Sequence, residues 1–182
     1  MIKHLMLDFE TLGSSHDAAV VSLGAVLFDR SGIKEERLWL FNLKGQLDSR
    51  RRVASGDTIA WWMKQEKAAR EVFEQAQTQG IYLQAFSHEF LAFCPQTLDV
   101  RVWGNGATFD IPIIESILNQ CGAPIPWKFW NHRCYRTLKS CYGIERGAKF
   151  EGTKHSALDD AKHQAKQLIA YWNGNQEKGL DK

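Results

Sequence analysis

The stretch LMLDFETLG, residues 5–13, places two carboxylates in an otherwise apolar run near the start of the chain. In a β-strand, Asp8 and Glu10 would share one face, while Leu7 and Phe9 share the other. Like charges that close raise each other's pKa and destabilise the fold unless a cation lies between them. Carboxylate oxygens suit Mg²⁺ or Mn²⁺. The stretch predicts a metal-binding strand, with a strand end and a solvated Glu10 as the alternative.

The length and composition fit one α/β domain. Of 182 residues, 44% are hydrophobic and 24% are charged, which is typical of a globular protein. No stretch is long enough to span a bilayer, and Asp8 interrupts the apolar opening before it reaches the length of a signal-peptide core. We expect a cytoplasmic protein without a membrane partner, with one domain over residues 1–175 and a polar tail over 176–182.

The basic residues are unevenly distributed, although the formal net charge is only +2. Between Lys128 and Lys154 seven basic residues stand against two acidic ones, and residues 49–56 hold three consecutive arginines. Solvated loops often carry such charges, so each cluster is only a weak indication of phosphate binding. The cysteines show no metal-type or C-x-x-C spacing, so we expect buried free thiols, with neither disulfide nor zinc, at Cys94, Cys121, Cys134 and Cys141.

Hydrophobic periodicity predicts a three-strand meander followed by helices and a fourth strand. After the first strand, residues 18–29 and 36–43 flank the turn DRSG, and residues 45–57 show no periodicity, as in a loop. A fourth strand is expected over residues 98–106. Helices are expected over residues 57–76, 85–94, 109–122, 132–142 and 157–172.

Acidic residues recur where these elements begin. Asp110 precedes Pro112 at the start of a helix, where an aspartate is often only an N-cap. At the last helix, Ser156 and Asp159 have capping-box spacing, which gives Asp159 a structural role and leaves Asp160 without one. The buried stripe of this helix is predicted to be Leu158, Ala161, Ala165, Leu168 and Trp172.

His155 lies just outside this last helix, after the Gly-rich loop RGAKFEGTK, residues 146–154. A histidine in a polar loop is usually only solvated, and helical periodicity does not separate Asp159 from Asp160. The residues alone therefore leave both questions open.

Three motifs in order resemble those of the DEDDh exonucleases, the family that includes polymerase proofreading subunits and ribonuclease T. LDFETLG supplies Asp8 and Glu10, WGNGATFDIPII supplies Asp110, and HSALDDA supplies His155 and, five residues later, Asp160. The chain is similar in particular to the compact bacterial and phage 3′-5′ exoribonuclease and exodeoxyribonuclease group. The resemblance implies a single-domain ribonuclease H-like fold, a mixed β-sheet flanked by α-helices.

The resemblance also implies a reaction, in which two Mg²⁺ or Mn²⁺ ions promote phosphodiester hydrolysis. Asp8 would bridge the ions, Glu10 and Asp160 would complete one site, and Asp110 would help to hold the other. His155 would be the general base. The expected substrate is single-stranded DNA or RNA with a free 3′ end, and the product is a nucleoside 5′-monophosphate.

Several residues are assigned to the substrate. In similar enzymes the positions of Thr11 and Leu12 contact the terminal sugar and base, although turn and core roles are equally open here. Trp61 and Trp62 are about 100° apart on the expected helix, so one can pack inward while the other stacks on a base. We assign stacking to Trp62, with core packing of both as the alternative.

The basic helix adds candidates for phosphate contacts, namely Arg133 and Arg136. Asn105 and Phe109 are expected to shape the loop around Asp110. No motif fixes contacts to a 2′-hydroxyl, so DNA and RNA stay equal candidates.

Two other functions compete with the exonuclease. A non-catalytic nucleic-acid-binding module of the same fold would be expected to lack one of the five site residues, yet all are filled. An endonuclease of the wider class is disfavoured by the histidine five residues before the last aspartate. A homodimer through the apolar, tryptophan-rich surfaces would be ordinary for so small an enzyme.

Overall fold

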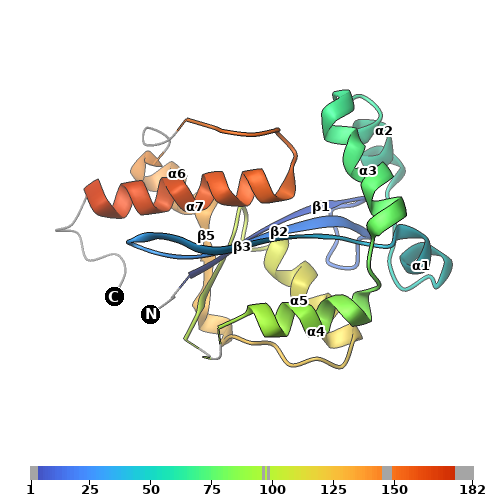
Figure 1. Ribbon diagram of the computed structural model, residues 1–182, viewed down its shortest axis with the longest axis horizontal. Coiled ribbons are helices and arrows are strands. Elements are labelled where there is room, and N and C mark those ends of the chain that lie inside the picture. Colours follow the sequence, from blue (N-terminus) through green and yellow to red (C-terminus); the bar gives the residue numbers. More distant parts are fainter. Residues whose placement is uncertain (1–3, 96, 98, 145–148, 175–182) are drawn as a thin grey trace.

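A mixed five-stranded β-sheet forms the centre of the computed structural model, which describes residues 4–95, 97, 99–144 and 149–174 (Figure 1). The strand order is β3-β2-β1-β4-β5. The first three strands are antiparallel, whereas β4 runs parallel to β1 and β5 runs parallel to β4, which confirms the α/β class and the opening meander. The strands are β1 (His4–Thr11), β2 (Val20–Asp29), β3 (Gly32–Leu40), β4 (Arg101–Gly104) and β5 (His132–Cys134).

Helices cover both faces of the sheet (Figure 1). One face is covered by α4 (Leu83–Phe93) and α5 (Asp110–Gln120), and the other by α6 (Tyr135–Tyr142) and α7 (Ala157–Gly174). The end of the sheet where β1 stops is flanked by α1 (Leu43–Asp48), α2 (Gly56–Trp62) and α3 (Lys67–Gln79). A short 3₁₀ helix, η1 (Phe129–Asn131), precedes β5.

Side-chain alternation along β1 divides the core between the two faces. Leu5, Leu7 and Phe9 are buried in the cluster that includes α4 and α5, whereas Met6 is buried in the cluster that includes α7. Asp8 and Glu10 continue the face of Met6. The predicted strand therefore directs both carboxylates toward the α7 side of the sheet.

The predicted helix over residues 57–76 is wrong in one respect, because the chain forms two helices there. The helix α2 ends at Trp62, and α3 begins at Lys67. Trp62, Ala69 and Ala76 are all buried in one cluster with the β1 and β2 ends. These residues are seven positions apart, so they would lie on one face of a single continuous helix. Hydrophobic periodicity therefore gave no indication of the break between α2 and α3.

Two short elements differ from the prediction. The expected loop over residues 45–57 contains most of α1, which begins where the Asn42 side chain accepts a hydrogen bond from the Gly45 N–H (2.7 Å). The expected basic helix over residues 132–142 starts with β5, and only Tyr135 onward is helical. Three residues are too few to show the alternation that identifies a strand.

The last helix follows the prediction closely, and α7 buries its expected stripe except for the partly buried Leu158. The capping box is wrong. Asp159 Oδ2 accepts from the Thr153 N–H (3.0 Å), while the Ser156 N–H donates to the Thr153 carbonyl (3.2 Å). Asp159 thus fastens the preceding loop to the helix instead of capping it.

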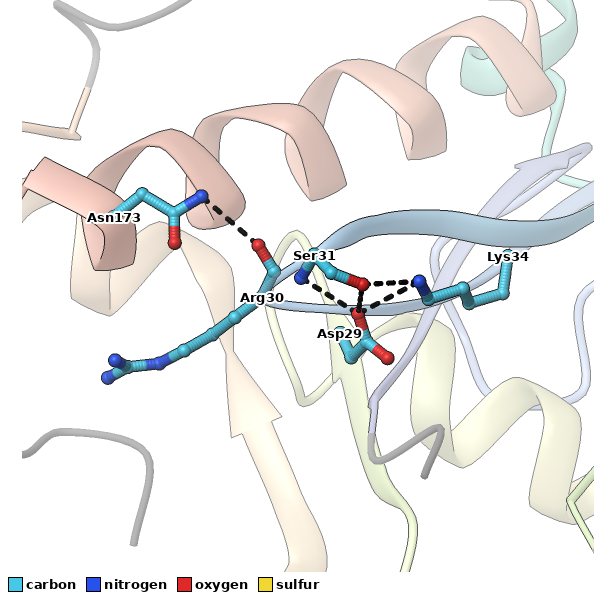
Figure 2. A network of polar contacts seen from close by, with 5 residues as sticks. All are labelled: Asp29, Arg30, Ser31, Lys34 and Asn173. Carbon is cyan, nitrogen blue, oxygen red and sulfur yellow. Dashed lines mark hydrogen bonds and ion pairs between the residues drawn. The ribbon is translucent and has the colours of Figure 1, made fainter.

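The far end of α7 is tied to the β2–β3 turn. Asn173 donates to the carbonyl of Arg30 (3.1 Å), and the turn itself is held by hydrogen bonds and an ion pair among Asp29, Ser31 and Lys34 (Figure 2). This contact fixes the C-terminal end of α7 to the turn between β2 and β3.

Other predictions have mixed outcomes. Cys94 is buried as expected, but Cys121 and Cys134 are only partly buried and Cys141 is exposed. The expected tail over residues 176–182 and the loop residues 146–148 lie outside the described residues. Among the described residues, no helix combines the length and the apolar character needed to cross a membrane.

Candidate active site

The end of β4 brings Asp110 to the carboxylates of β1. The β1–β4 ladder stops at the Leu7–Gly104 pair, so the Phe9 N–H lies beyond it and donates instead to Asp110 Oδ1 (3.0 Å). Asp110 is buried and is the first residue of α5, not its N-cap. A Cβ at Gly104 would lie 2.7 Å from Asp110 Oδ2, so glycine makes this close approach feasible.

A second glycine brings α7 down onto the sheet. Gly24 of β2 pairs with Asp8, and a Cβ at this position would lie 2.2 Å from the Ala157 carbonyl oxygen. The first turn of α7 therefore rests directly on the β2 backbone, and Asp160 faces the β1 carboxylates. Because the chain packs this closely, residues from opposite ends of the described sequence share one site.

His155 joins the cluster from the loop before α7. Its N–H donates to Asp160 Oδ2 (2.9 Å), and its backbone adopts the left-handed region at φ 62°. One ligand atom from each of Glu10, His155 and Asp160 lies within 4.8 Å of the others. Asp160 thus has a structural contact as well, contrary to the expectation that it has none.

The carboxylates repel one another in a buried setting. Burial is the largest influence that raises the pKa of Asp8 well above its ordinary range, and Asp110, Glu10 and Asp160 raise it further. A hydrogen bond from Gln164 opposes this rise. The mutual repulsion shows that all four carboxylates lie close together.

Two of these groups have pKa values shifted into the neutral range. Burial, with repulsion from Asp160 and Asp110, raises the pKa of Glu10 to about 8. Burial also raises the pKa of Asp110 to about 7, although the Phe9 N–H opposes it. A divalent cation would relieve this repulsion, and hard oxygen donors are the ligands that such cations prefer. The residues present therefore fit a divalent metal centre.

The two tryptophans have different environments. Trp62 is buried, and its indole N–H donates to the Thr11 carbonyl (2.9 Å), so the structure removes the stacking face that we assigned to it. Trp61 is 42% exposed, and its ring meets the His155 ring edge to face at 5.2 Å between centroids. Of the pair, Trp61 has the accessible ring beside the histidine.

Thr11 and Leu12 are both buried in this structure. The Thr11 hydroxyl donates to the Gly13 carbonyl (2.6 Å), and Leu12 packs in the cluster with Trp62. Their side chains therefore have the turn and core roles that were left open, at the edge of the site.

Of the two arginines predicted to contact phosphates, Arg136 lies at the site and Arg133 does not. Arg136 is exposed, donates to the Asn105 carbonyl (2.7 Å), and lowers the pKa of Asp110, so it belongs to the site. Arg133 donates to the carbonyls of Trp130 and His132, and its charged neighbour Arg101 is at the opposite end of β4. The structure does not bring Arg133 to the carboxylates.

The arginine run at residues 49–56 includes a buried member. Arg52 is 2% exposed, and its guanidinium donates to the His16 carbonyl (2.8 Å). Burial lowers its pKa to about 10. Arg52 therefore fastens a loop to the core and is not available to a phosphate.

One site residue was missed from the sequence. Gln164 on α7 is buried and donates from Nε2 to Asp8 Oδ1 (2.8 Å). A signal was present, because Gln164 follows Asp160 by four residues and so lies one helical turn further along the same face.

A ribonuclease H-like sheet with four clustered carboxylates and a loop histidine defines the class of DEDDh-type exonucleases. A family model described as the 3′-5′ exoribonuclease Rv2179c-like domain matches residues 3–172, and the chain belongs to that family. The chain is also similar to an exodeoxyribonuclease of Enterobacteria phage T4, with 27% identity over 161 residues, 72% of this chain and 68% of the relative.

Solved structures of E. coli exonuclease I share the fold. The zinc-bound complex with single-stranded DNA has a TM-score of 0.64 at 14% identity, over 98% of this chain and 41% of that one. The complex with a dT13 oligonucleotide has a TM-score of 0.66 at 12% identity, over 95% and 41%. The chain therefore spans about two fifths of the length of exonuclease I.

Proposed function

We propose that this protein is a metal-dependent 3′-5′ exonuclease that removes nucleoside 5′-monophosphates from single-stranded nucleic acid. The observation that carries the proposal is the convergence of Glu10, His155 and Asp160 within 4.8 Å, beside the partly buried Asp8 and the buried Asp110. The family description as an exoribonuclease, and the single-stranded DNA in the exonuclease I complexes, support the class of substrate.

The four carboxylates would hold two divalent cations, Mg²⁺ or Mn²⁺. Asp8 and Glu10 would supply ligands from β1, Asp160 from α7 and Asp110 from α5. Such a pair supplies an activated water and charge stabilisation for the leaving oxygen. The sheet contributes by fixing the ligands, since Asp8 and Glu10 lie on a strand paired along its length with β2.

His155 would take the proton of the attacking water. Its backbone is fastened to Asp160, so the imidazole is delivered next to the carboxylates without being part of a strand or helix. An imidazole titrates near neutral pH and suits general-base catalysis. His155 would therefore act in proton transfer, whereas the carboxylates would bind the metal ions.

Trp61 and Arg136 are the residues best placed to contact the strand. Trp61 presents an exposed ring beside His155, which suits stacking on a base. Arg136 is an exposed cation next to Asp110, which suits a phosphate. The buried Trp62 packs against Leu12 and donates a hydrogen bond to the Thr11 carbonyl. The terminal nucleoside would lie beside Thr11 and Leu12.

Matched 5′-labelled DNA and RNA strands test the proposal. We expect stepwise shortening from the 3′ end with Mg²⁺ or Mn²⁺, resistance of strands that end in a 3′-phosphate, and no cleavage of single-stranded circles. Rapid cutting of circles would identify an endonuclease, and binding without cleavage would identify the non-catalytic module. The same assay ranks DNA against RNA.

The cytoplasmic location and the homodimer stay predictions of the sequence. Light scattering of the purified chain tests the second, and a monomer at the concentrations used for catalysis would contradict it.

A further inference from the structure

Gln164 lies in the carboxylate cluster without being a candidate metal ligand. It is 4% exposed, and its Nε2 donates to Asp8 Oδ1 (2.8 Å). A primary amide has two donors and one acceptor oxygen, so an amide beside a carboxylate turns its nitrogen toward that carboxylate. The contact therefore holds Asp8 in one orientation.

The other end of this amide is unsatisfied. Within the part of the chain that the structure describes, the buried Oε1 of Gln164 accepts no hydrogen bond. Leaving a buried acceptor without a partner is destabilising, so native proteins rarely retain one without a reason. The missing partner must be a donor, and the position is next to the predicted cations.

We propose that Gln164 is a positioning residue for the metal centre: Nε2 orients Asp8, and Oε1 accepts a hydrogen bond from a water that enters with the cation. This rests on the proposed function. Mg²⁺ characteristically keeps several of its waters, and water is a strong donor. Groups that orient metal ligands commonly change metal affinity about 10- to 100-fold when they are replaced.

Gln167 on the same helix is a matched control. It is also 4% exposed, but its Oε1 accepts from the Tyr135 hydroxyl of α6 and not from a group of the carboxylate cluster. Methionine has nearly the shape of glutamine without its hydrogen bonds. Gln164→Met and Gln167→Met are therefore the same chemical change at the same burial, and they differ only in what the amide contacts.

Calorimetric titration of the full chain with Mn²⁺, without nucleic acid, measures the role directly. We expect Gln164→Met to weaken Mn²⁺ binding about 10- to 100-fold. We expect its melting temperature in EDTA to stay close to that of wild type, because the variant loses the unsatisfied Oε1 together with the hydrogen bond to Asp8. Gln167→Met should melt earlier and bind Mn²⁺ normally. Equal Mn²⁺ affinities for wild type and Gln164→Met would overturn the proposal.

A crystal structure of the wild type with Mn²⁺ provides a second measurement that does not depend on a variant folding. We expect a water within hydrogen-bond distance of Gln164 Oε1, and a site without that water would overturn its acceptor role. A wild type that binds no Mn²⁺ would refute the proposed function together with this inference, whereas normal binding by Gln164→Met would refute only the inference.

Discussion

The carboxylates and the histidine of the site are held in contrasting ways. Asp8 and Glu10 lie on a strand that pairs with β2 along its length and with β4 over its first half, and Asp110 is buried and bonded to that strand. His155 lies outside the helices and strands, partly exposed and at a positive φ, and its N–H is fastened to one carboxylate. Groups that must hold a cation are fixed by the fold, whereas the proposed proton acceptor is attached to its edge.

This difference has a thermodynamic side. Metal binding needs several ligands in fixed positions, which a paired strand supplies before the metal arrives. A general base needs only reach, and a loop lets it approach the site without disturbing the ligands. Substitutions in the two regions should therefore fail in different ways.

The largest loss is expected for Asp8→Asn, which removes the charge of a proposed metal ligand that lies close to the other three carboxylates. We expect activity as low as in excess EDTA, together with loss of Mn²⁺ binding measured by calorimetry. Asp48→Asn is the control, since Asp48 pairs with Lys44 on the exposed face of α1, where an ion pair contributes little. Full activity of the wild type in excess EDTA would refute the two-metal account.

A smaller loss is expected at the loop. His155→Asn should slow single-turnover hydrolysis about 10²- to 10⁴-fold while Mn²⁺ binding persists, because only the base is removed. Asparagine tolerates the left-handed region better than alanine does, so the loop should keep its shape. His155→Ala provides the comparison.

Asp160→Ala should instead weaken Mn²⁺ binding itself, and Asp159→Ala should not. Two results would contradict these roles. One is a histidine variant as fast as wild type, and the other is normal Mn²⁺ binding by Asp160→Ala with loss in Asp159→Ala.

A third variant tests whether the fold really fixes the ligands. Gly24→Ala places a Cβ against the Ala157 carbonyl, and crowding of a packed interior typically costs about 1–3 kcal/mol. We expect a lower melting temperature and weaker Mn²⁺ binding, since α7 carries Asp160. Gly56→Ala is the matched control, because a Cβ there meets nothing within 4 Å. Identical behaviour of the two variants would show that α7 is free to shift.

The stability of the metal-free protein should also depend on pH. The pKa values of Glu10 and Asp110 are raised to about 8 and about 7 in the fold, so the native state binds more protons than the unfolded state between about pH 4 and 8. Stability in EDTA should therefore fall as the pH rises through that window. A pKa that differs by one between the two states changes the free energy of unfolding by about 1.4 kcal/mol, or the melting temperature by roughly 3–6 °C.

Saturating Mg²⁺ should reverse most of this fall, because the cation replaces the protons. Melting curves at several pH values with and without Mg²⁺ measure it. A metal-free protein that becomes more stable from pH 5 to 8 would contradict the repulsion among the carboxylates.

Much of this arrangement was predictable from local signals. The alternation around Asp8 predicted the strand and the shared face of its carboxylates, and three motifs in order predicted which other groups would join them. The helix α7 was well predicted because its apolar stripe extends over several turns. A long periodic element and a short motif each depend on residues that are close together in the sequence, so both can be recognised without knowledge of the fold.

The remaining features depend on contacts between distant residues. The exposure of Trp61 and the burial of Trp62 follow from a hydrogen bond to Thr11, which no periodicity shows. The buried Arg52 looked like its neighbours in an arginine run. The close packing at Gly24 was indicated by the sequence, since a glycine inside an apolar strand often marks a close approach of another backbone.

The hydrogen bond from Gln164 to Asp8 joins residues 156 positions apart, which has a consequence for biosynthesis. A ribosome releases β1 long before α7, since chains emerge from the N-terminal end. A growing chain that has passed α5 then carries Asp8, Glu10 and Asp110 without His155, Asp160 or Gln164. The proposed site therefore cannot be complete until most of the described chain has been translated.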